Sequence, residues 1–184
     1  MIHPHLSPVT TDLSWNELVL DKATLGQVEE IKTWLKQSSS VKLDKRLKKK
    51  LKAGYRTLFY GPAGTGKTLT AALIGKECNK TVYKIDLSKV VSKYIGETEK
   101  NLELIFAHAK DKGWILFFDE ADALFGKRTE PKDSHDRYAN LEVSYLLKRV
   151  EDYNGLVILA TNMKGNLDEA FTRRFNLMIR FNSR

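Results

Sequence analysis

Cysteine is nearly absent from this 184-residue chain, in which Cys78 stands alone. A single cysteine excludes an internal disulfide framework and favours a reducing compartment, so we expect a cytoplasmic protein. Cys78 falls on the apolar face of an expected helix, and we interpret it as a packing residue. Stability must then come from a hydrophobic core, for which this length suffices in one compact domain.

Long apolar runs are also absent. The longest are WILFF at residues 114–118 and LVILA at residues 156–160, which are far too short to cross a bilayer. The opening stretch MIHPHLSPVTTDLSW lacks the basic and apolar regions of a secretory signal. We therefore expect no membrane partner. Apolar and charged fractions of 42% and 29% are ordinary for a globular chain, which excludes disordered and fibrous classes.

Positive charge is in excess, with a formal net charge of +8. Much of it comes from the run KLDKRLKKKLK at residues 42–52, in which Leu43, Leu47 and Leu51 recur at helical spacing. This pattern predicts a basic amphipathic helix whose lysines either form a solvated face or bind an acidic partner such as nucleic acid. We favour the solvated face, because nucleic-acid binders usually pair basic residues with a recognisable reading module.

From Thr57 onward, short apolar runs alternate with helical patterns. The runs TLFY, TVYKI, WILFF, LVILA and LMIRF are short, bounded and mostly rich in branched or aromatic residues, so they predict buried strands. This alternation predicts an α/β fold with a parallel sheet covered by helices on both faces. The apolar stripes of the expected helices are Leu25, Val28, Ile31 and Leu35, then Leu102, Ile105, Phe106 and Ala109, then Val143, Leu146, Leu147 and Val150.

The segment YGPAGTGKT follows the first predicted strand and opens a helix, which is the context that a phosphate-binding Walker A loop requires. Glycines let backbone amides approach phosphate oxygens without a Cβ in the way. Lys67 is expected to reach the β- and γ-phosphates of ATP, and Thr68 to ligate Mg²⁺. The expected nucleotide-binding residues of this loop are Gly61, Pro62, Ala63, Gly64, Thr65, Gly66, Lys67, Thr68 and Leu69.

An acidic pair ends the strand WILFF, as expected for a Walker B element. Asp119 would direct its carboxylate at the Mg²⁺ beside Thr68. Glu120 would orient or deprotonate a water that attacks the γ-phosphate. Alone, such a pair is equally consistent with a helix cap. Following a Walker A loop, it predicts ATP hydrolysis.

Together these motifs resemble the AAA+ superfamily and, within it, the AAA family of hexameric protein-remodelling ATPases. LVILATN resembles the strand that ends in the sensor 1 residue, here Asn162. NLDEAFTRRFN resembles the second region of homology, whose arginines reach the neighbouring subunit's site. Arg173 and Arg174 are adjacent, whereas two residues separate them in the commonest family pattern, so either one is a candidate arginine finger. The resemblance implies a three-layer P-loop domain with five parallel strands in the order 5-1-4-3-2.

Two further sites follow from this resemblance. The segment VSKYIGETE occupies the position of pore loop 1, and Tyr94, Ile95 and Gly96 match its aromatic, aliphatic and glycine pattern. The family therefore implies that these residues grip a polypeptide substrate. The segment WNELVLDKATLGQVEEI resembles the piece that runs past the adenine, which makes Val19 and Leu20 candidate base contacts.

The family pattern also divides the chain into an N-terminal linker and helical segment at residues 1–52 and a nucleotide-binding core at residues 53–184. The helical lid that follows the fifth strand in the family would begin where this sequence ends, so we expect a large subdomain without its lid. Residues 132–162 resemble the AAA ATPases encoded with bacterial contractile injection systems, which implies a role in assembling, remodelling or recycling such an apparatus.

The expected function is that of an ATPase motor that forms a homo-hexamer and remodels or threads a protein. Two alternatives stay open. The net charge supports a nucleic-acid motor or loader, but the KYIGE loop carries little of the Lys and Arg expected in a loop that follows phosphates. A scaffold that binds ATP with negligible turnover is disfavoured by the joint presence of Lys67, Asp119, Glu120, Asn162 and the arginine pair.

Overall fold

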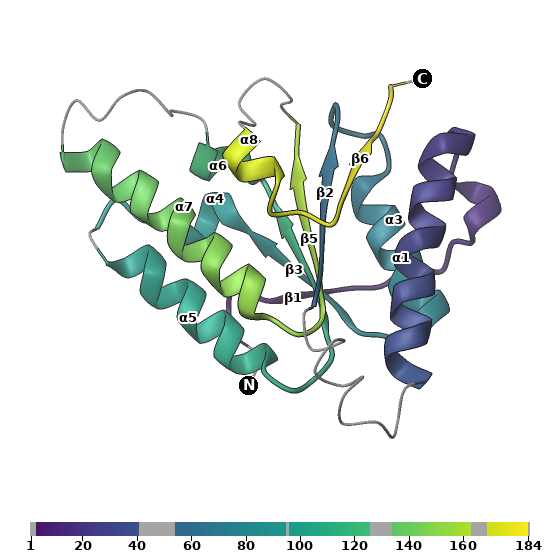
Figure 1. Cartoon of the computed structure of the whole chain (residues 1–184), viewed down its shortest axis with the longest axis horizontal. Coiled ribbons are helices and arrows are strands. Elements are labelled where there is room, and N and C mark those ends of the chain that lie inside the picture. Colours follow the sequence, from purple (N-terminus) through teal and green to yellow (C-terminus); the bar gives the residue numbers. More distant parts are fainter. Residues whose placement is uncertain (1–2, 41–53, 95, 126–133, 163–168, 184) are drawn as a thin grey trace.

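The computed structural model describes residues 3–40, 54–94, 96–125, 134–162 and 169–183. Figure 1 shows three layers, with a twisted sheet between two pairs of helices. One face carries α1 (Lys22–Ser40) and α3 (Lys67–Cys78), and the other carries α5 (Glu97–Ala109) and α7 (Ser134–Asp152). The three-layer α/β prediction is confirmed. The basic run at residues 42–52 lies outside the described residues.

Six strands form the described part of the sheet, in the order β1-β3-β4-β5-β2-β6. From β6 to β3 the neighbours are parallel, and these five strands have the expected order 5-1-4-3-2. Parallel neighbours require crossover connections, which the long helices supply. The strands are β1 (Ser7–Val9), β2 (Tyr55–Tyr60), β3 (Val82–Asp86), β4 (Ile115–Asp119), β5 (Leu156–Thr161) and β6 (Leu177–Arg180).

The strand β1 departs from the expected sheet. It pairs antiparallel with β3, with Ser7 opposite Lys84 and Val9 opposite Val82. The prediction of a purely parallel, five-stranded sheet is therefore wrong. An edge strand presents unpaired amide and carbonyl groups, and the N-terminal segment pairs with those of β3. Three residues that include Pro8 give no strand signal in the sequence, because proline cannot donate to a ladder and is confined to edges.

Short helices connect the main elements. One turn of 3-10 helix, η1 (Trp15–Glu17), precedes α1. The others are α4 (Leu87–Val90) after β3, α6 (Asp122–Phe125) after β4, and α8 (Glu169–Thr172) before β6. Among the described residues, no helix has both the length and the apolar character that crossing a membrane requires.

Side chains of the central strands alternate between two hydrophobic cores, as the period of two in a strand requires. Leu116 and Phe118 of β4 pack on the side of α5 and α7, whereas Ile115 and Phe117 pack on the side of α1 and α3. The predicted stripes of α5 and α7 are fully buried. In α1 the stripe is buried except for its first member, Leu25, which is exposed. Both faces of the sheet are thus fixed by packing.

Leu6, directly before β1, anchors the N-terminal segment, because its side chain is only 5% exposed and belongs to the core beside α5 and α7. We predict that Leu6→Ala lowers the free energy of unfolding by about 2–4 kcal/mol, since it removes buried methyl groups and leaves a cavity. Leu104→Ala is the matched control, because that side chain is 42% exposed on α5. Denaturant unfolding measures both, and equal losses would contradict the anchoring role.

Candidate functional site

The loop between β2 and α3 has a backbone that requires glycine. Gly61 has a φ of 144°, and a Cβ there would lie 2.0 Å from the carbonyl oxygen of Phe181. Its amide donates to the carbonyl oxygen of Thr161 at 3.2 Å. Gly66 has a φ of 99° and caps α3, and a Cβ there would lie 2.8 Å from Leu18 Cδ1. The loop is therefore held on two sides, with the N-terminus of α3 suited to an anion.

Lys67 is the first residue of α3 and is 8% exposed. Its Nζ donates to the carbonyl oxygens of Gly61 at 2.6 Å and Pro62 at 2.8 Å. Burial lowers the pKa of this ammonium, and the carboxylates at the end of β4 and just beyond it, Asp119 first among them, oppose that shift. In a nucleotide complex, the Lys67 ammonium could exchange these neutral carbonyl acceptors for charged phosphate oxygens, which are stronger acceptors.

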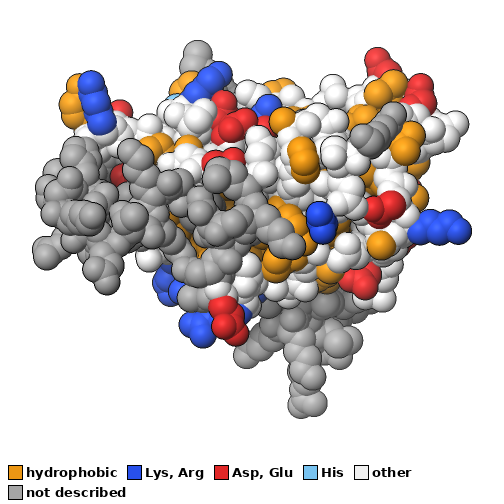
Figure 2. All heavy atoms as spheres, turned by 90° about the horizontal axis from the view of Figure 1, so that it is seen from above, with side chains coloured by type: hydrophobic (Ala, Val, Ile, Leu, Met, Phe, Trp, Pro, Cys, Tyr) orange, Lys and Arg blue, Asp and Glu red, His pale blue; other side chains and the backbone are white. Residues whose placement is uncertain are grey.

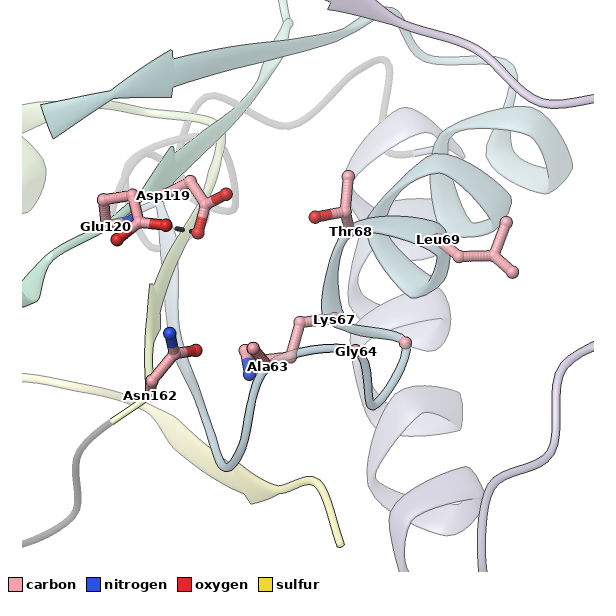
Figure 3. A pocket seen from close by; sticks show the side chains of 9 residues that line it. Ala63, Gly64, Lys67, Thr68, Leu69, Asp119, Glu120 and Asn162 are labelled. Carbon is pink, nitrogen blue, oxygen red and sulfur yellow. Dashed lines mark hydrogen bonds between the residues drawn. The ribbon is translucent and has the colours of Figure 1, made fainter. Parts of the chain in front are cut away.

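A cavity of about 380 Å³ brings the predicted motifs together. The P-loop forms one wall, and the ends of β4 and β5 form the opposite wall (Figure 3). This volume is in the range of cavities that bind small molecules and cofactors. The lining residues are Ala63, Gly64, Gly66, Lys67, Thr68, Leu69, Asp119, Glu120 and Asn162.

The Thr68 hydroxyl and the Asp119 carboxylate point toward each other across this cavity (Figure 3). Both are hard oxygen donors, of the kind that Mg²⁺ takes together with substrate phosphates. The residues present therefore fit the predicted magnesium site. Asp119 Oδ2 also lies 3.4 Å from Nζ of Lys84 in the neighbouring strand β3. This ion pair partly balances the charge of Asp119.

Glu120 follows β4 in a backbone conformation that is rare for a residue with a side chain. Its φ is 57°, in the left-handed region, and its amide donates to Asp119 Oδ1 at 2.8 Å. Such conformations cost about 1–3 kcal/mol and occur where the surrounding structure over-determines them, often at active sites. Its side chain reaches the cavity opposite the P-loop (Figure 3).

Asn162 directly follows β5, and its side chain lines the same cavity. Its backbone amide donates to Asp122 Oδ2 at 3.3 Å, and the hydroxyl of Thr161 donates to Asp122 Oδ1. A backbone hydrogen bond of 3.1 Å from Ala121 N to the Ala160 oxygen runs beside them. The residues after β4 are thus joined by hydrogen bonds to the last residues of β5 and to Asn162.

The two candidate arginines have different surroundings, and both lie outside the lining of the cavity. Arg174 Nε is 3.6 Å from Glu151 Oε1, and its carbonyl oxygen accepts from Arg56 Nε at 2.9 Å. Arg173 is exposed and forms no ion pair with the described residues. A single chain therefore engages Arg174 and leaves Arg173 facing outward.

Tyr94 is 62% exposed on a loop that is otherwise anchored. The amide of Ser92 donates to Thr98 Oγ1 at 2.8 Å, and the Ser92 hydroxyl accepts from the Tyr94 amide at 3.1 Å. Gly96 has a φ of 80° and caps α5. The aromatic ring is thus exposed next to a hydrogen-bonded turn at Ser92. Ile95, the second predicted gripping residue, lies outside the described residues.

The predicted base contacts are only partly brought to the P-loop. Leu18 and Leu20 lie against Gly66, whereas Val19 is exposed. Neither Val19 nor Leu20 is part of the described cavity lining. Leu18 was missed by sequence reasoning, because an alternating apolar segment does not reveal which side chain turns inward.

Sequence reasoning also missed Lys84, Asp122 and Thr161. Lys84 had a weak signal, a charge inside the apolar run VYKID. The signals for the other two were stronger, since Asp122 is a second aspartate in FFDEAD and Thr161 directly precedes Asn162. What the sequence could not show is that they contact each other.

Comparison with known proteins identifies the family to which this chain belongs. Residues 57–183 match the model of the ATPase family associated with various cellular activities (AAA). The chain belongs to the AAA family. An uncharacterized AAA family ATPase, y4kL, from Sinorhizobium fredii (strain NBRC 101917 / NGR234) is 33% identical over 172 residues, which are 90% of this AAA chain and 49% of the relative.

Two further relatives agree with this assignment. Spastin from Homo sapiens is 38% identical over 124 residues, or 64% of this AAA chain and 20% of spastin. The crystal structure of the FIGL-1 AAA domain in complex with ADP matches with a TM-score of 0.69 and 26% identity, covering 97% of this chain and 58% of that one. This AAA chain therefore spans about half of the Sinorhizobium relative and a fifth of spastin.

Two glycines of the P-loop, Gly61 and Gly64, differ in the space around them, so their substitution should affect stability to different extents. We predict that Gly61→Ala lowers the free energy of unfolding by about 3 kcal/mol or more, because its Cβ would collide with a backbone oxygen in addition to adopting positive φ. Gly64→Ala, with a φ of 76° and open space around its Cβ, should cost only about 1–2 kcal/mol. Thermal or denaturant unfolding tests the contrast, which equal losses would refute.

Proposed function

We propose that this protein binds ATP with Mg²⁺ and hydrolyses it as a subunit of a homo-hexameric motor that remodels or threads a protein substrate. The observation that supports it most is the cavity of about 380 Å³, which the P-loop, Asp119, Glu120 and Asn162 line together. The similar FIGL-1 AAA domain was crystallised in complex with ADP, which supports an adenine nucleotide as the ligand. A single cysteine favours a cytoplasmic setting.

Each side chain has a chemical role in this proposal. Lys67 and the P-loop amides bind the β- and γ-phosphates, and Thr68 with Asp119 would hold Mg²⁺, which neutralises charge on the phosphates. Glu120 accepts a proton from, or orients, the attacking water. Asn162 donates a hydrogen bond to the γ-phosphate or to that water. We assign Leu20, together with its neighbour Val19, to bordering the adenine.

Arg173 is our preferred arginine finger. Because it is exposed and unpaired among the described residues, its guanidinium is available to the nucleotide of a neighbouring subunit. Arg174 is engaged within its own chain by Glu151, so we assign it to holding the segment before β6 in place. This assignment makes hydrolysis depend on assembly.

Tyr94 is proposed to contact the protein substrate together with Ile95, and Gly96 permits the loop to move. An exposed aromatic ring packs on almost any extended chain and gives a grip that tolerates many sequences. Lys93 Nζ lies 5.6 Å from the Tyr94 ring centroid. The loop therefore presents an aromatic surface with one adjacent cation.

The finer biological role rests on resemblance alone. We propose that the protein serves in assembling or recycling a contractile injection apparatus, because residues 132–162 resemble the ATPases of that group. A nucleic-acid motor is less favoured. Figure 2, seen from the end where β2 and β5 finish, shows Lys and Arg side chains scattered singly among the described residues of that face. A nucleic-acid track would require a continuous basic surface.

The first test is ATP turnover per subunit of the full-length protein at increasing protein concentration. We expect the rate to rise steeply as subunits assemble, Glu120→Gln to lower it by about 100-fold or more, and Arg173→Ala by about 1,000-fold. Arg174→Ala, the matched control, should lower turnover less than Arg173→Ala.

Mixing the variants separates a shared site from a self-contained one. Subunits with Glu120→Gln still supply Arg173 to neighbours that carry Arg173→Ala and an intact Glu120. We therefore expect mixtures to recover part of the turnover that each variant lacks alone. A rate independent of concentration and insensitive to both arginines would refute the ring motor.

Substrate gripping has its own test. We predict that Tyr94→Ala lowers the rate of ATP-dependent unfolding of a tagged model protein by about 10-fold or more, whereas Tyr94→Phe retains it, because the aromatic face provides the contact. Leu104→Ala, which also removes an exposed hydrophobic side chain, is the control. Fluorescence loss of the model protein measures unfolding, and equal effects of the two alanine substitutions would contradict the assignment.

A further inference from the structure

The ladder between β4 and β5 ends before it reaches the residues that line the cavity. The last paired residues are Phe118 and Leu159. Asp119 and Glu120 lie beyond this pair on one strand, and Asn162 lies beyond it on the other. Other contacts must therefore fix the distance and orientation between the acidic pair and Asn162.

Asp122 supplies two such contacts between described residues. It begins α6, and its two carboxylate oxygens bind two different groups at the end of β5. Oδ1 accepts from the Thr161 hydroxyl, and Oδ2 accepts from the backbone amide of Asn162 at 3.3 Å. The hydrogen bond from Ala121 N to the Ala160 oxygen continues the connection on the strand side. Neither Asp122 nor Thr161 belongs to the described lining of the cavity.

Thr161 extends the same connection to the P-loop. Its side chain is buried, and the residue is only 3% exposed. Its carbonyl oxygen accepts from the Gly61 amide at 3.2 Å while its hydroxyl binds Asp122. One residue thus contacts the start of the phosphate loop and the segment that follows the acidic pair. Its own successor in the chain is Asn162.

We propose that Asp122 and Thr161 are positioning residues for ATP hydrolysis, which hold Glu120 and Asn162 at a fixed separation across the nucleotide cavity. This inference rests on the hydrolytic function proposed above. Glu120 needs such support, because its positive φ is a strained conformation that only its surroundings maintain. Binding of the phosphates depends on the P-loop, so loss of this support should affect catalysis more than nucleotide affinity.

Charge and geometry can be separated at Asp122. Its carboxylate also opposes the lowered pKa of Lys67, so a loss of charge could act through that lysine. An asparagine at this position can accept from the Asn162 amide with Oδ1 and donate to the Thr161 hydroxyl with Nδ2. Asp122→Asn therefore removes the charge and keeps the geometry, whereas Asp122→Ala removes both.

The experiment compares Asp122→Ala, Asp122→Asn, Thr161→Val and Thr161→Ser in the full-length protein. We expect Asp122→Ala and Thr161→Val to lower kcat by about 10- to 100-fold, with KM for ATP changed by less than about 3-fold. Asp122→Asn and Thr161→Ser should each retain most of the kcat, because both keep the hydrogen bonds. Asp152→Ala, at an exposed aspartate near the end of α7, is the control and should match the unsubstituted protein.

A readout independent of turnover is the backbone amide resonance of Asn162 in a nitrogen–proton correlation spectrum. Loss of its carboxylate acceptor in Asp122→Ala should move this resonance upfield, whereas Asp152→Ala should leave it in place. If the unsubstituted protein failed to hydrolyse ATP, the proposed function would fall. The inference itself would fall if the resonance did not move, or if kcat were equal in Asp122→Ala and Asp152→Ala. Equal losses of kcat in Asp122→Ala and Asp122→Asn would also overturn it, since charge would then be the cause.

Discussion

Parallel pairing of β2 and β4 with the central strand β5 is the constraint on which the site depends. Tyr60 of β2 lies opposite Thr161, and Phe118 of β4 lies opposite Leu159. Parallel strands finish at the same edge of a sheet, so the segments that follow them must meet there. Sequence segments separated by many residues consequently form one cavity. A register shift in either pair would separate them.

The two hydrophobic cores hold this register. Side chains of β4 and β5 alternate into the two cores, and a shift by one residue would turn every apolar side chain to the wrong face. Close packing on both sides also explains how the molecule sustains two unfavourable features at its site. These are the buried ammonium of Lys67 and the left-handed backbone of Glu120. Each is supported by hydrogen bonds that a loosely packed edge would not keep in place.

Two exposed side chains also have roles in the proposed function. Tyr94 and Arg173 are exposed and do not line the described cavity of their own chain, although the proposed activity uses both. In the proposed function, both side chains make their contacts with other chains. An exposed aromatic ring and an exposed guanidinium contribute most to binding free energy when a partner excludes water from them. The cavity is thus built within one chain, whereas the proposed roles of Tyr94 and Arg173 require a second chain.

The local chemistry of the site was evident in the linear order of residues. The P-loop glycines and Lys67 have fixed spacings because neighbouring atoms along the chain must surround one phosphate group. The acidic pair was evident as two carboxylates directly after an apolar strand. The apolar periods of α5, α7 and the inner strands likewise identified the layers, since burial on a helix or strand repeats with its geometry. Only the tertiary structure revealed β1, the ion pair of Lys84 with Asp119, and the contact of Asp122 with Thr161. Each of these joins segments that are distant in the chain, and their proximity arises from the order and register of the strands rather than from any local preference.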